Sequence, residues 1–396
     1  MPIANKTKGA VMERNARFPV ECKVAETLDR KLEKFDGPPF QFPSLEQLID
    51  GARSLIASRE SEAFELIDAR WLTGGASKLQ MAFTLKWAAT NNVPARNEKM
   101  VLRMEPAASV CETSRMREFQ LLQYFEGQIP LPKPYWVDEY AEHFPYPALI
   151  YGFSQGVTKP SLTKSNVTGL GTNVGPELRP TLSRQFIRHL ALIHNSPIDM
   201  EKLSAFEIPD HPETAALWAL NWWERVWHED KAADIPLMAL AAGWMRNNLP
   251  HNDHACIVHA DFRTGNFLLD ENSGDITAWL DWELGHIGDR HEDLAWSMST
   301  AFGHWSENGE EFLVCGLMTE EEFISAYEAA TGLSVDKKRL HFYKILSAYK
   351  AIVIVLAAGY HIANNGKSHQ DVLLVWLTGL SAPLMGELLR LLEEVM

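Results

Sequence analysis

The sequence of 396 residues predicts an α+β protein with two lobes, a small and mostly antiparallel sheet followed by a larger helical lobe. Three strand-like segments follow one another early in the chain, at Phe64 to Leu72, Leu79 to Trp87 and Lys99 to Met104. From Pro180 onward, apolar residues recur with the spacing of helices. One β-hairpin interrupts this helical part, within the stretch from Cys256 to Trp296.

We expect three regions along the chain. Residues 1–60 form an extension packed on the small lobe, residues 61–152 form that lobe, and residues 153–396 form the larger lobe. Within the extension, Ser44 can cap a short helix that runs to Ser58, because apolar residues recur on one face of it. No chemistry can be assigned to the extension.

The composition is that of a globular protein with an acidic balance. Apolar residues make up 46% of the chain, and 52 acidic against 37 basic residues give a net charge of −15. This charge argues against nucleic acid or an anionic membrane as a partner.

The four cysteines lack C-x-x-C spacing, so neither a zinc site nor a disulfide framework is indicated. The N-terminus lacks the apolar core of a secretory signal, and the longest apolar run, Ala351 to Gly359, is too short to span a bilayer, so a cytoplasmic protein without a membrane partner is expected.

The turn between the first two strands contains two glycines in the sequence Leu72-Thr-Gly-Gly-Ala-Ser-Lys78. Backbone N–H groups in such a turn can approach triphosphate oxygens closely. The same sequence also suits a plain hairpin turn, and the chain contains neither G-x-G-x-x-G nor a P-loop. The candidate phosphate-binding residues in this turn are Gly74, Gly75, Ser77 and Lys78.

A helix and two strands are expected to complete the small lobe. Ser109 and Glu112 have the spacing of a capping box, which predicts a helix from Ser109 to Glu126. A proline-rich connection leads to a strand at Tyr135 to Val137. The segment Pro147 to Gly152 has the character of a buried strand that ends in a flexible joint.

One motif near this joint indicates a different chemistry. Gly152-Phe153-Ser154-Gln155-Gly156 matches G-x-S-x-G, the nucleophile elbow of serine hydrolases. That elbow requires a helix directly after the serine, but Val157 to Pro160 contains β-branched residues and a proline. A hydrolase with Ser154 as nucleophile is therefore disfavoured.

Helical patterns dominate the rest of the chain. They predict helices from Pro180 to Asn195, from about Pro212 to His228 and from Leu237 to Asn248, and a later one capped by Thr319 and Glu322. The second carries four tryptophans, which are more often core than pocket. Whether they line a binding site for a substrate stays open.

The predicted hairpin carries the residues with the clearest chemistry. Asp261 and Asn266 precede its first strand, and Asp281 follows its second strand, so all three lie at the same end of the ladder. Their oxygens suit magnesium, which leaves positions open for phosphate. One Asn and one Asp for the metal, with a second Asp to accept a proton, are what phosphoryl transfer from a nucleotide to a hydroxyl needs. We interpret His259 as structural and Asp293 as a brace for the loop that contains Asp261.

The spacing of these residues resembles a known family. His-x-Asp-x4-Asn with an Asp 15 residues later, within HADFRTGN…LDWE…GD…DLAW, is similar to the aminoglycoside phosphotransferase family. The fuller string is most similar to the branch related to the phosphotransferase domain found fused to acyl-CoA dehydrogenases. The resemblance implies a protein-kinase-like fold with Asp261 as catalytic base and Asn266 and Asp281 as magnesium ligands. Arg263 is expected to stabilise charge on the transferred group, and Glu283 to support the metal site.

The resemblance also implies a nucleotide site between the lobes. Arg103 takes the place of the lysine that binds the α- and β-phosphates in protein kinases, and Glu118 is its expected partner. Arginine remains charged and binds phosphate bidentately, so this role is retained. Backbone groups of Leu149, Ile150 and Tyr151 are expected to bind adenine at the hinge between the lobes.

The sequence therefore predicts a small-molecule kinase that uses Mg²⁺ and ATP, with GTP as the alternative nucleotide, to phosphorylate a hydroxyl group. Both a cationic antibiotic and a hydroxyacyl thioester remain candidate acceptors, and the oligomeric state stays open. A nucleotide-binding pseudoenzyme is disfavoured because Asp261, Asn266 and Asp281 are intact. A protein kinase is disfavoured because Trp282-Glu283 replaces Phe-Gly and the glycine-rich signature is missing.

Overall fold

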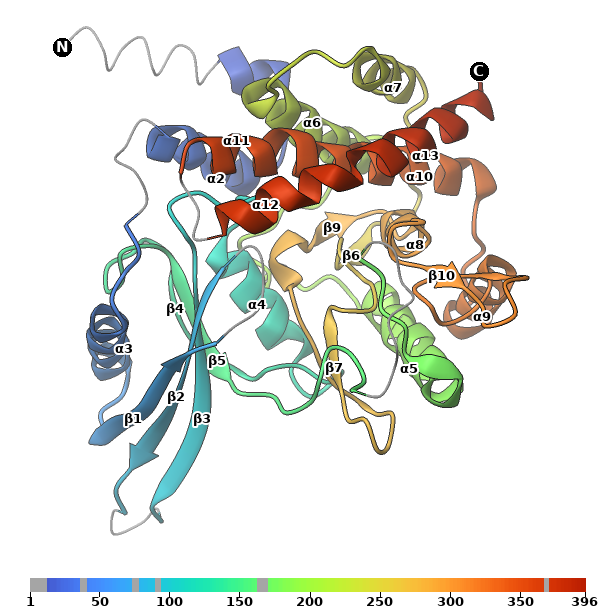
Figure 1. Cartoon of the computed structure of the whole chain (residues 1–396). Coiled ribbons are helices and arrows are strands. Elements are labelled where there is room, and N and C mark those ends of the chain that lie inside the picture. The colour runs from blue at the N-terminus through green and yellow to red at the C-terminus, as the bar shows by residue number, and fades with distance from the viewer. Residues whose placement is uncertain (1–12, 36–40, 73–77, 90–93, 162–169, 367–369) are drawn as a thin grey trace, which may run out of the picture.

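A five-stranded antiparallel sheet forms the small lobe (Figure 1). The strand order is β1-β2-β3-β5-β4 in the computed structural model, which describes residues 13–35, 41–72, 78–89, 94–161, 170–366 and 370–396. The strands are β1 (Phe64–Trp71), β2 (Leu79–Trp87), β3 (Arg96–Met104), β4 (Pro134–Asp138) and β5 (Ala148–Gly152). The predicted strands are confirmed, although β3 begins earlier than Lys99.

Helix α3 (Leu45–Arg59) covers one face of this sheet. Its start is the predicted one, because the Ser44 hydroxyl accepts a hydrogen bond from the Gln47 N–H and the Gln47 side chain completes a capping box. Leu48 and Leu55 are buried in the same hydrophobic cluster as the sheet. The second half of the extension therefore packs where it was expected.

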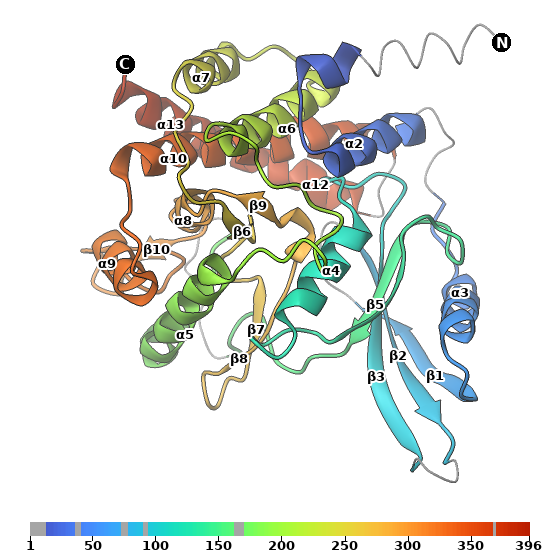
Figure 2. The same cartoon turned by 180° about the vertical axis from the view of Figure 1, so that it is seen from behind.

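Helix α2 (Cys22–Phe35) instead packs on the larger lobe, which corrects the prediction that all of residues 1–60 lie on the small one (Figure 2). Val24 and Leu28 belong to the core of the larger lobe, and buried Lys31 pairs with Asp230 at the end of helix α6 (Thr214–Asp230). The sequence could not assign this helix to a lobe, because its apolar stripe fits either partner and the deciding ion pair joins distant segments.

Helix α4 (Arg115–Phe125) lies between the sheet and the larger lobe, and it begins later than predicted. Its cap is Ser114, which accepts a hydrogen bond from the Arg117 N–H. The Ser109 N–H does bond to Glu112, but the hydroxyl of Ser109 accepts a hydrogen bond from buried Lys78. The capping-box spacing thus stabilises a buried loop that precedes the helix.

The larger lobe is built mainly from helices. They are α5 (Gly175–Asn195), α6 (Thr214–Asp230), α7 (Pro236–Asn247), α8 (His291–Ser297), α9 (Glu320–Thr331), α10 (Lys337–Ile352), α11 (Tyr360–Asn364), α12 (Asp371–Leu377) and α13 (Ser381–Glu393), with 3-10 turns at Trp282–Leu284 (η1) and Thr378–Leu380 (η3) and short strands β10 (His304–Trp305) and β11 (Phe312–Leu313). Helix α5 begins before Pro180, with Pro176 in its first turn, where the missing N–H has no intrahelical partner to lose. No helix follows Ser154 directly, as predicted.

Two long helices are present in the C-terminal part of the chain. A π-helical turn, η2 (Val353–Gly359), joins α10 to α11 in one helix, Lys337–Asn364, and η3 joins α12 to α13 in another, Asp371–Glu393. By length and composition alone both could cross a membrane; 72% of the most apolar stretch is buried in the first, which is a core helix, but only 17% in the second. The absence of a membrane partner, which was based on the acidic net charge, the lack of a secretory signal and the short run Ala351 to Gly359, stays a prediction.

Candidate active site

The predicted hairpin is present. Strand β7 (Phe267–Leu269) pairs antiparallel with β8 (Ile276–Trp279), and Gly274 adopts a positive φ of 73° in the turn between them. Strand β6 (Cys256–Val258), which precedes the loop of residues 259–266, pairs with β9 (His286–Gly288). We call residues 259–266 the catalytic loop.

The hairpin brings the three predicted side chains to one end. The Asn266 amide nitrogen lies 2.6 Å from Oδ2 of Asp261, and the Leu280 N–H donates to the Asn266 carbonyl at 2.8 Å. Asp281 follows directly, with a positive φ of 58°. Asp261 and Asp281 line one cavity. Asp261 and Asp281, which are well separated in the sequence, thus lie at the same end of the hairpin, as the pairing of its two strands predicted.

Asp293 holds the catalytic loop from helix α8. Its carboxylate accepts the N–H of His259 at 2.8 Å and the N–H of Ala260 at 2.7 Å. Burial alone would raise the pKa of Asp293, but its hydrogen bond to His194 and the donors of the loop lower the pKa below its ordinary value. The ionised carboxylate is therefore a brace, as predicted.

His259 is fully buried and serves the structure. Its Nε2 lies 3.0 Å from the carbonyl oxygen of Leu280, and its ring lies 4.5 Å from that of Trp282. Burial lowers the pKa of His259, although the nearby carboxylates of Asp293 and Asp261 act in the opposite direction. A neutral imidazole that joins the two ends of the hairpin matches the structural interpretation.

Three donors orient the Asp261 carboxylate. Oδ1 accepts hydrogen bonds from Arg263 Nε at 3.0 Å and from Trp296 Nε1 at 2.6 Å, and Oδ2 accepts from the Asn266 amide. An ionised carboxylate has about four acceptor positions, so one position on Oδ2 stays available to a hydroxyl group. Sequence analysis missed Trp296, although its spacing of three residues from Asp293 on one helix places both on the same face.

The donor set suits a nucleotide-bound magnesium ion. The Asn266 NH₂ group contacts two acceptors of Asp261, its backbone oxygen at 3.0 Å and Oδ2, so Asn266 Oδ1 must point away from Asp261. Among the described residues, no three His, Cys, Asp or Glu side chains are grouped so that they could hold a metal by themselves. Magnesium in nucleotide sites takes only one or two protein carboxylates together with phosphate oxygens, which Asp281 and Asn266 fit.

The predicted ion pair between Arg103 and Glu118 is present, with 3.0 Å between Nη1 and Oε1. Arg103 is buried, and its Nη2 also lies 2.7 Å from Oδ1 of Asp281 and 3.3 Å from Oε2 of Glu283. Arg103 therefore neutralises the carboxylate that is expected to bind magnesium. Its guanidinium reaches the site from β3, as the sequence indicated.

Glu283 is the centre of a buried charge cluster. Its carboxylate lies 3.2 Å from Lys78 Nζ and 2.9 Å from Arg115 Nη2, in addition to Arg103. Burial would raise the pKa of Glu283, but these three cations hold it well below its ordinary range. Glu283 thus holds Lys78, Arg103 and Arg115 together; its expected support of the metal site stays a prediction.

Lys78 belongs to this charge cluster and is buried. The other candidate residues of the first turn, Gly74, Gly75 and Ser77, lie outside the described residues. Their proposed contact with phosphate stays a prediction.

The structure revises the expected adenine contact. Leu149, Ile150 and Tyr151 lie within β5, which pairs with β3 on one side and with β4 on the other. The backbone groups of these three residues are engaged in the sheet, so they are not available to a base. Backbone recognition of adenine would fall to the segment after Gly152, where the strand has ended.

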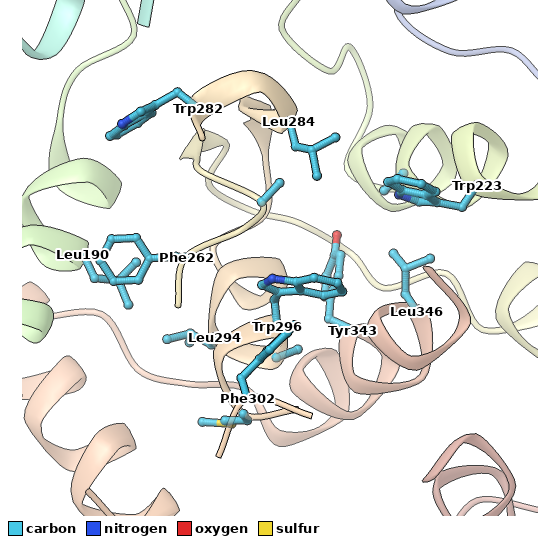
Figure 3. Close-up of a cluster of buried hydrophobic side chains, with 14 of the residues drawn as sticks. Leu190, Trp223, Phe262, Trp282, Leu284, Leu294, Trp296, Phe302, Tyr343 and Leu346 are labelled. Carbon is cyan, nitrogen blue, oxygen red and sulfur yellow. The ribbon is translucent and has the colours of Figure 1, made fainter. Parts of the chain in front are cut away.

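A cavity of about 210 Å³ adjoins the catalytic loop. Asp261, Arg263, Asp281 and Glu283 supply its charged wall. Its remaining wall is apolar and includes Trp296, Phe302, Ile354, Leu374, Leu377 and Leu380. Within the described chain, none of the α6 tryptophans lines this cavity; Trp222, Trp223 and Trp227 are buried in the core (Figure 3 shows Trp223).

Solved structures share this fold. A candidate aminoglycoside phosphotransferase from Ralstonia eutropha superposes with a TM-score of 0.61, covering 90% of this chain and 99% of that chain at 18% identity. Macrolide 2'-phosphotransferase type I gives a TM-score of 0.51, covering 85% and 97% at 17% identity. The fold is thus the kinase-like fold of the aminoglycoside phosphotransferases, as predicted.

The sequence comparisons identify the family. The profile described as Phosphotransferase enzyme family matches residues 86–343, more than half of the chain. The protein belongs to this phosphotransferase family.

Curated relatives include human acyl-CoA dehydrogenase family member 11, 26% identical over 281 residues that cover 67% of this chain and 34% of that protein. The protein of the same name from Gallus gallus is 34% identical over 139 residues, or 33% of this chain and 18% of that protein. The chain thus spans about a third of the human relative and less of the chicken one.

Proposed function

We propose that this phosphotransferase moves the terminal phosphate of a magnesium-bound nucleoside triphosphate, with ATP the first candidate and GTP the second, to the hydroxyl group of a small molecule. One observation carries the proposal. Asp261, with one acceptor position open on Oδ2, lines the same cavity as Asp281, while Arg103 and Asn266 lie beside them. A base, a metal-binding pair and a phosphate-binding cation are therefore within one site.

Each residue has a distinct role in the proposed reaction. Asp261 orients the acceptor hydroxyl and takes its proton as the new O–P bond forms and the bond to the leaving diphosphate oxygen breaks. Arg263, held against Asp261, stabilises charge on the transferred group. Asn266 and Asp281 would hold magnesium, and the bound ion would supply neutralisation of the charge on the phosphate oxygens. Arg103 exchanges its contact with Asp281 for the phosphates, since both are anions that it can bind.

The cavity favours an acceptor with an apolar body. Its wall is mostly aliphatic and aromatic, and two of its acidic groups, Asp281 and Glu283, are already paired with cations. A polycationic antibiotic would find few free carboxylates there. The curated relatives carry the name acyl-CoA dehydrogenase. We therefore propose a hydroxyacyl thioester as acceptor.

Replacement of the base tests the reaction. Asp261→Asn should lower the turnover of Mg²⁺·ATP with the best acceptor by about 10²- to 10⁴-fold, since the proton has lost its acceptor, while nucleotide binding is kept. Product formation is followed by mass spectrometry and nucleotide binding by calorimetry. Asp275→Asn, at an exposed position in the turn of the same hairpin, is the matched control and should keep full activity. Unchanged turnover by Asp261→Asn would show that another group is the base.

Filling the cavity tests the acceptor. Leu380→Trp should raise the KM for a medium-chain hydroxyacyl-CoA by about tenfold or more and leave the KM for ATP nearly unchanged, because the added ring occupies the apolar wall. Leu389→Trp, at an exposed position of α13, is the control. A clear preference of the wild-type enzyme for aminoglycosides over hydroxyacyl-CoA would overturn this choice of acceptor.

A further inference from the structure

We propose that Lys350 is a positioning residue of the catalytic loop, which holds Asp261 in its reactive orientation through Ala260 and Trp296. The inference rests on the proposed function of Asp261 as the base. Lys350 lies on α10, far from the catalytic loop in sequence, and no sequence motif marks it.

Lys350 is a buried cation with unusual partners. Its side chain is among the buried polar groups at 2% exposure, and its Nζ donates to the carbonyl oxygen of Ala260 at 2.5 Å. The same nitrogen lies 4.2 Å from the ring centroid of Trp296 and 5.4 Å from that of Trp223. Figure 3 shows these two tryptophans on α8 and α6, beside the α10 residues Tyr343 and Leu346.

Stability alone gives little reason for this arrangement. The two other buried lysines of the described chain, Lys31 and Lys78, pair with the carboxylates of Asp230 and Glu283. Among the salt bridges of the described residues, none involves Lys350. A buried ammonium group without a carboxylate is costly compared with an apolar side chain of similar size. We infer that its retained charge serves the loop that it contacts.

The first contact fixes the peptide next to the base. Ala260 has a positive φ of 62°, a conformation that residues other than glycine rarely adopt. Its N–H is held by Asp293 and its carbonyl by Lys350, so both ends of the residue are restrained. Asp261 is the next residue, and the direction of its side chain follows from this restrained backbone.

The second contact acts on the carboxylate itself. Trp296 donates its indole N–H to Oδ1 of Asp261 at 2.6 Å, and the ammonium group of Lys350 lies on the face of the same indole. A cation on an aromatic face draws electron density toward itself, which strengthens the N–H as a donor. Lys350 thus restrains Asp261 from two directions, although it is not among the residues that line the cavity.

The test compares variants that separate charge from packing. Lys350→Met should lower kcat for Mg²⁺·ATP with hydroxyacyl-CoA by about 10- to 100-fold and leave the KM for ATP within about twofold, because a displaced base slows the chemical step without altering nucleotide binding. Lys350→Arg keeps the cation and should restore kcat to within about fivefold of wild type. Lys344→Met removes a partly exposed lysine of α10 that pairs with Glu320 of α9, and this variant should behave as wild type.

A second variant and a spectroscopic signal keep the proposal testable if Lys350→Met does not fold. Trp296→Phe keeps an aromatic ring at this position and removes the indole N–H that donates to Asp261, so it should reproduce most of the loss in kcat. In protein labelled with 5-fluorotryptophan, the ¹⁹F signal that disappears in Trp296→Phe should shift in Lys350→Met and not in Lys344→Met. Thermal unfolding of every variant shows whether it is folded.

The outcomes distinguish the two proposals. Wild-type kcat in Lys350→Met, or in Trp296→Phe where Lys350→Met does not fold, would overturn the positioning role. Equal losses in Lys350→Met and Lys350→Arg would overturn the role of charge. A wild-type protein that neither binds nor turns over Mg²⁺·ATP would overturn the proposed function itself, and this inference with it.

Discussion

The orientation of single side chains decides what the site can do. Three donors fix the Asp261 carboxylate, and the amide of Asn266 can face it in only one way, so the open acceptor position and the free amide oxygen are both defined. Aromatic packing adds to this order, because Phe262 of the catalytic loop stacks on Trp279 with 3.9 Å between the ring centroids. The orientation of Asp261 thus depends both on the donors around its carboxylate and on the aromatic packing of the loop.

One of these supports makes the stability of the protein depend on pH. His189 on α5 accepts a hydrogen bond from the indole N–H of Trp279 at 2.9 Å. Burial, aided by the charge of Arg188, lowers the pKa of His189 from 6.5 to about 4. The unfolded chain therefore binds the proton first as the pH falls. The contribution of neutral His189 to the free energy of unfolding should be fully present above pH 6.5. It should decrease by about 3 kcal/mol as the pH falls from 6.5 to 4.

Urea unfolding at several pH values checks this expectation. His189→Gln should show a smaller decrease between pH 6.5 and pH 4 than the wild type, since it has no imidazole to protonate. The exposed His211 provides the matched control, and His211→Gln should retain the wild-type slope. The same slope in all three proteins would mean that other groups set the acid sensitivity.

At the scale of elements, the site is a meeting point of four segments that carry charge. Strand β3 supplies Arg103, helix α4 supplies Arg115 and Glu118, the segment before β2 supplies Lys78, and η1 supplies Glu283. Arg115 also pairs with Glu118. These ion pairs link the small sheet to the segment that follows the hairpin of the larger lobe, so they position Arg103 and Lys78, the proposed phosphate-binding cations, relative to Asp261.

Removal of the central anion should weaken this junction strongly. Glu283→Gln leaves the three buried cations with less compensation, which should lower the free energy of unfolding by about 3–5 kcal/mol. Glu320→Gln breaks an exposed pair with Lys344 and should change it by less than about 1 kcal/mol. Chemical denaturation of both variants measures the difference. A loss below about 1 kcal/mol for Glu283→Gln would show that the cluster contributes little to stability.

At the scale of the whole molecule, the site lies where the two lobes meet. The sheet contributes Arg103, the hairpin contributes Asp261 and Asp281, and the C-terminal helices close the cavity with apolar side chains. Helix α2 belongs to the larger lobe and α3 to the smaller one, so the N-terminal segment also connects the two. A ligand in the proposed site would contact both lobes and stabilise them together.

Ligand binding should therefore raise the melting temperature in a way that depends on metal. A non-hydrolysable ATP analogue with Mg²⁺, at about 100 times its Kd, should add about 2.7 kcal/mol to the free energy of unfolding, which corresponds to a few degrees. Mg²⁺ alone, or the analogue with a chelator, should have a much smaller effect. Asp281→Ala should remove the dependence on metal. A shift of equal size without Mg²⁺ would contradict the assignment of Asp281 and Asn266 as metal ligands.

Local features of the sequence predicted most of the elements and the centre of the site. Periodicity located the strands β1 to β3 and the helices α3, α6 and α7, because side chains alternate with the geometry of each element. The hairpin placed Asp261, Asn266 and Asp281 together because a short turn fixes the register of its two strands. Each of these conclusions depends on neighbours within a few dozen residues.

The sequence by itself thus determined the two-lobe class, the phosphotransferase family and the acidic centre of the site. Each of these follows from residue spacings within short segments, which can be recognised without knowledge of the fold. Tertiary structure alone decided that α2 joins the larger lobe, that the backbone groups of Leu149, Ile150 and Tyr151 are engaged in the sheet, and that Trp222, Trp223 and Trp227 lie in the core. It alone brought Lys350 against Ala260, because contacts between segments so far apart depend on how whole helices pack, and no local pattern records that packing.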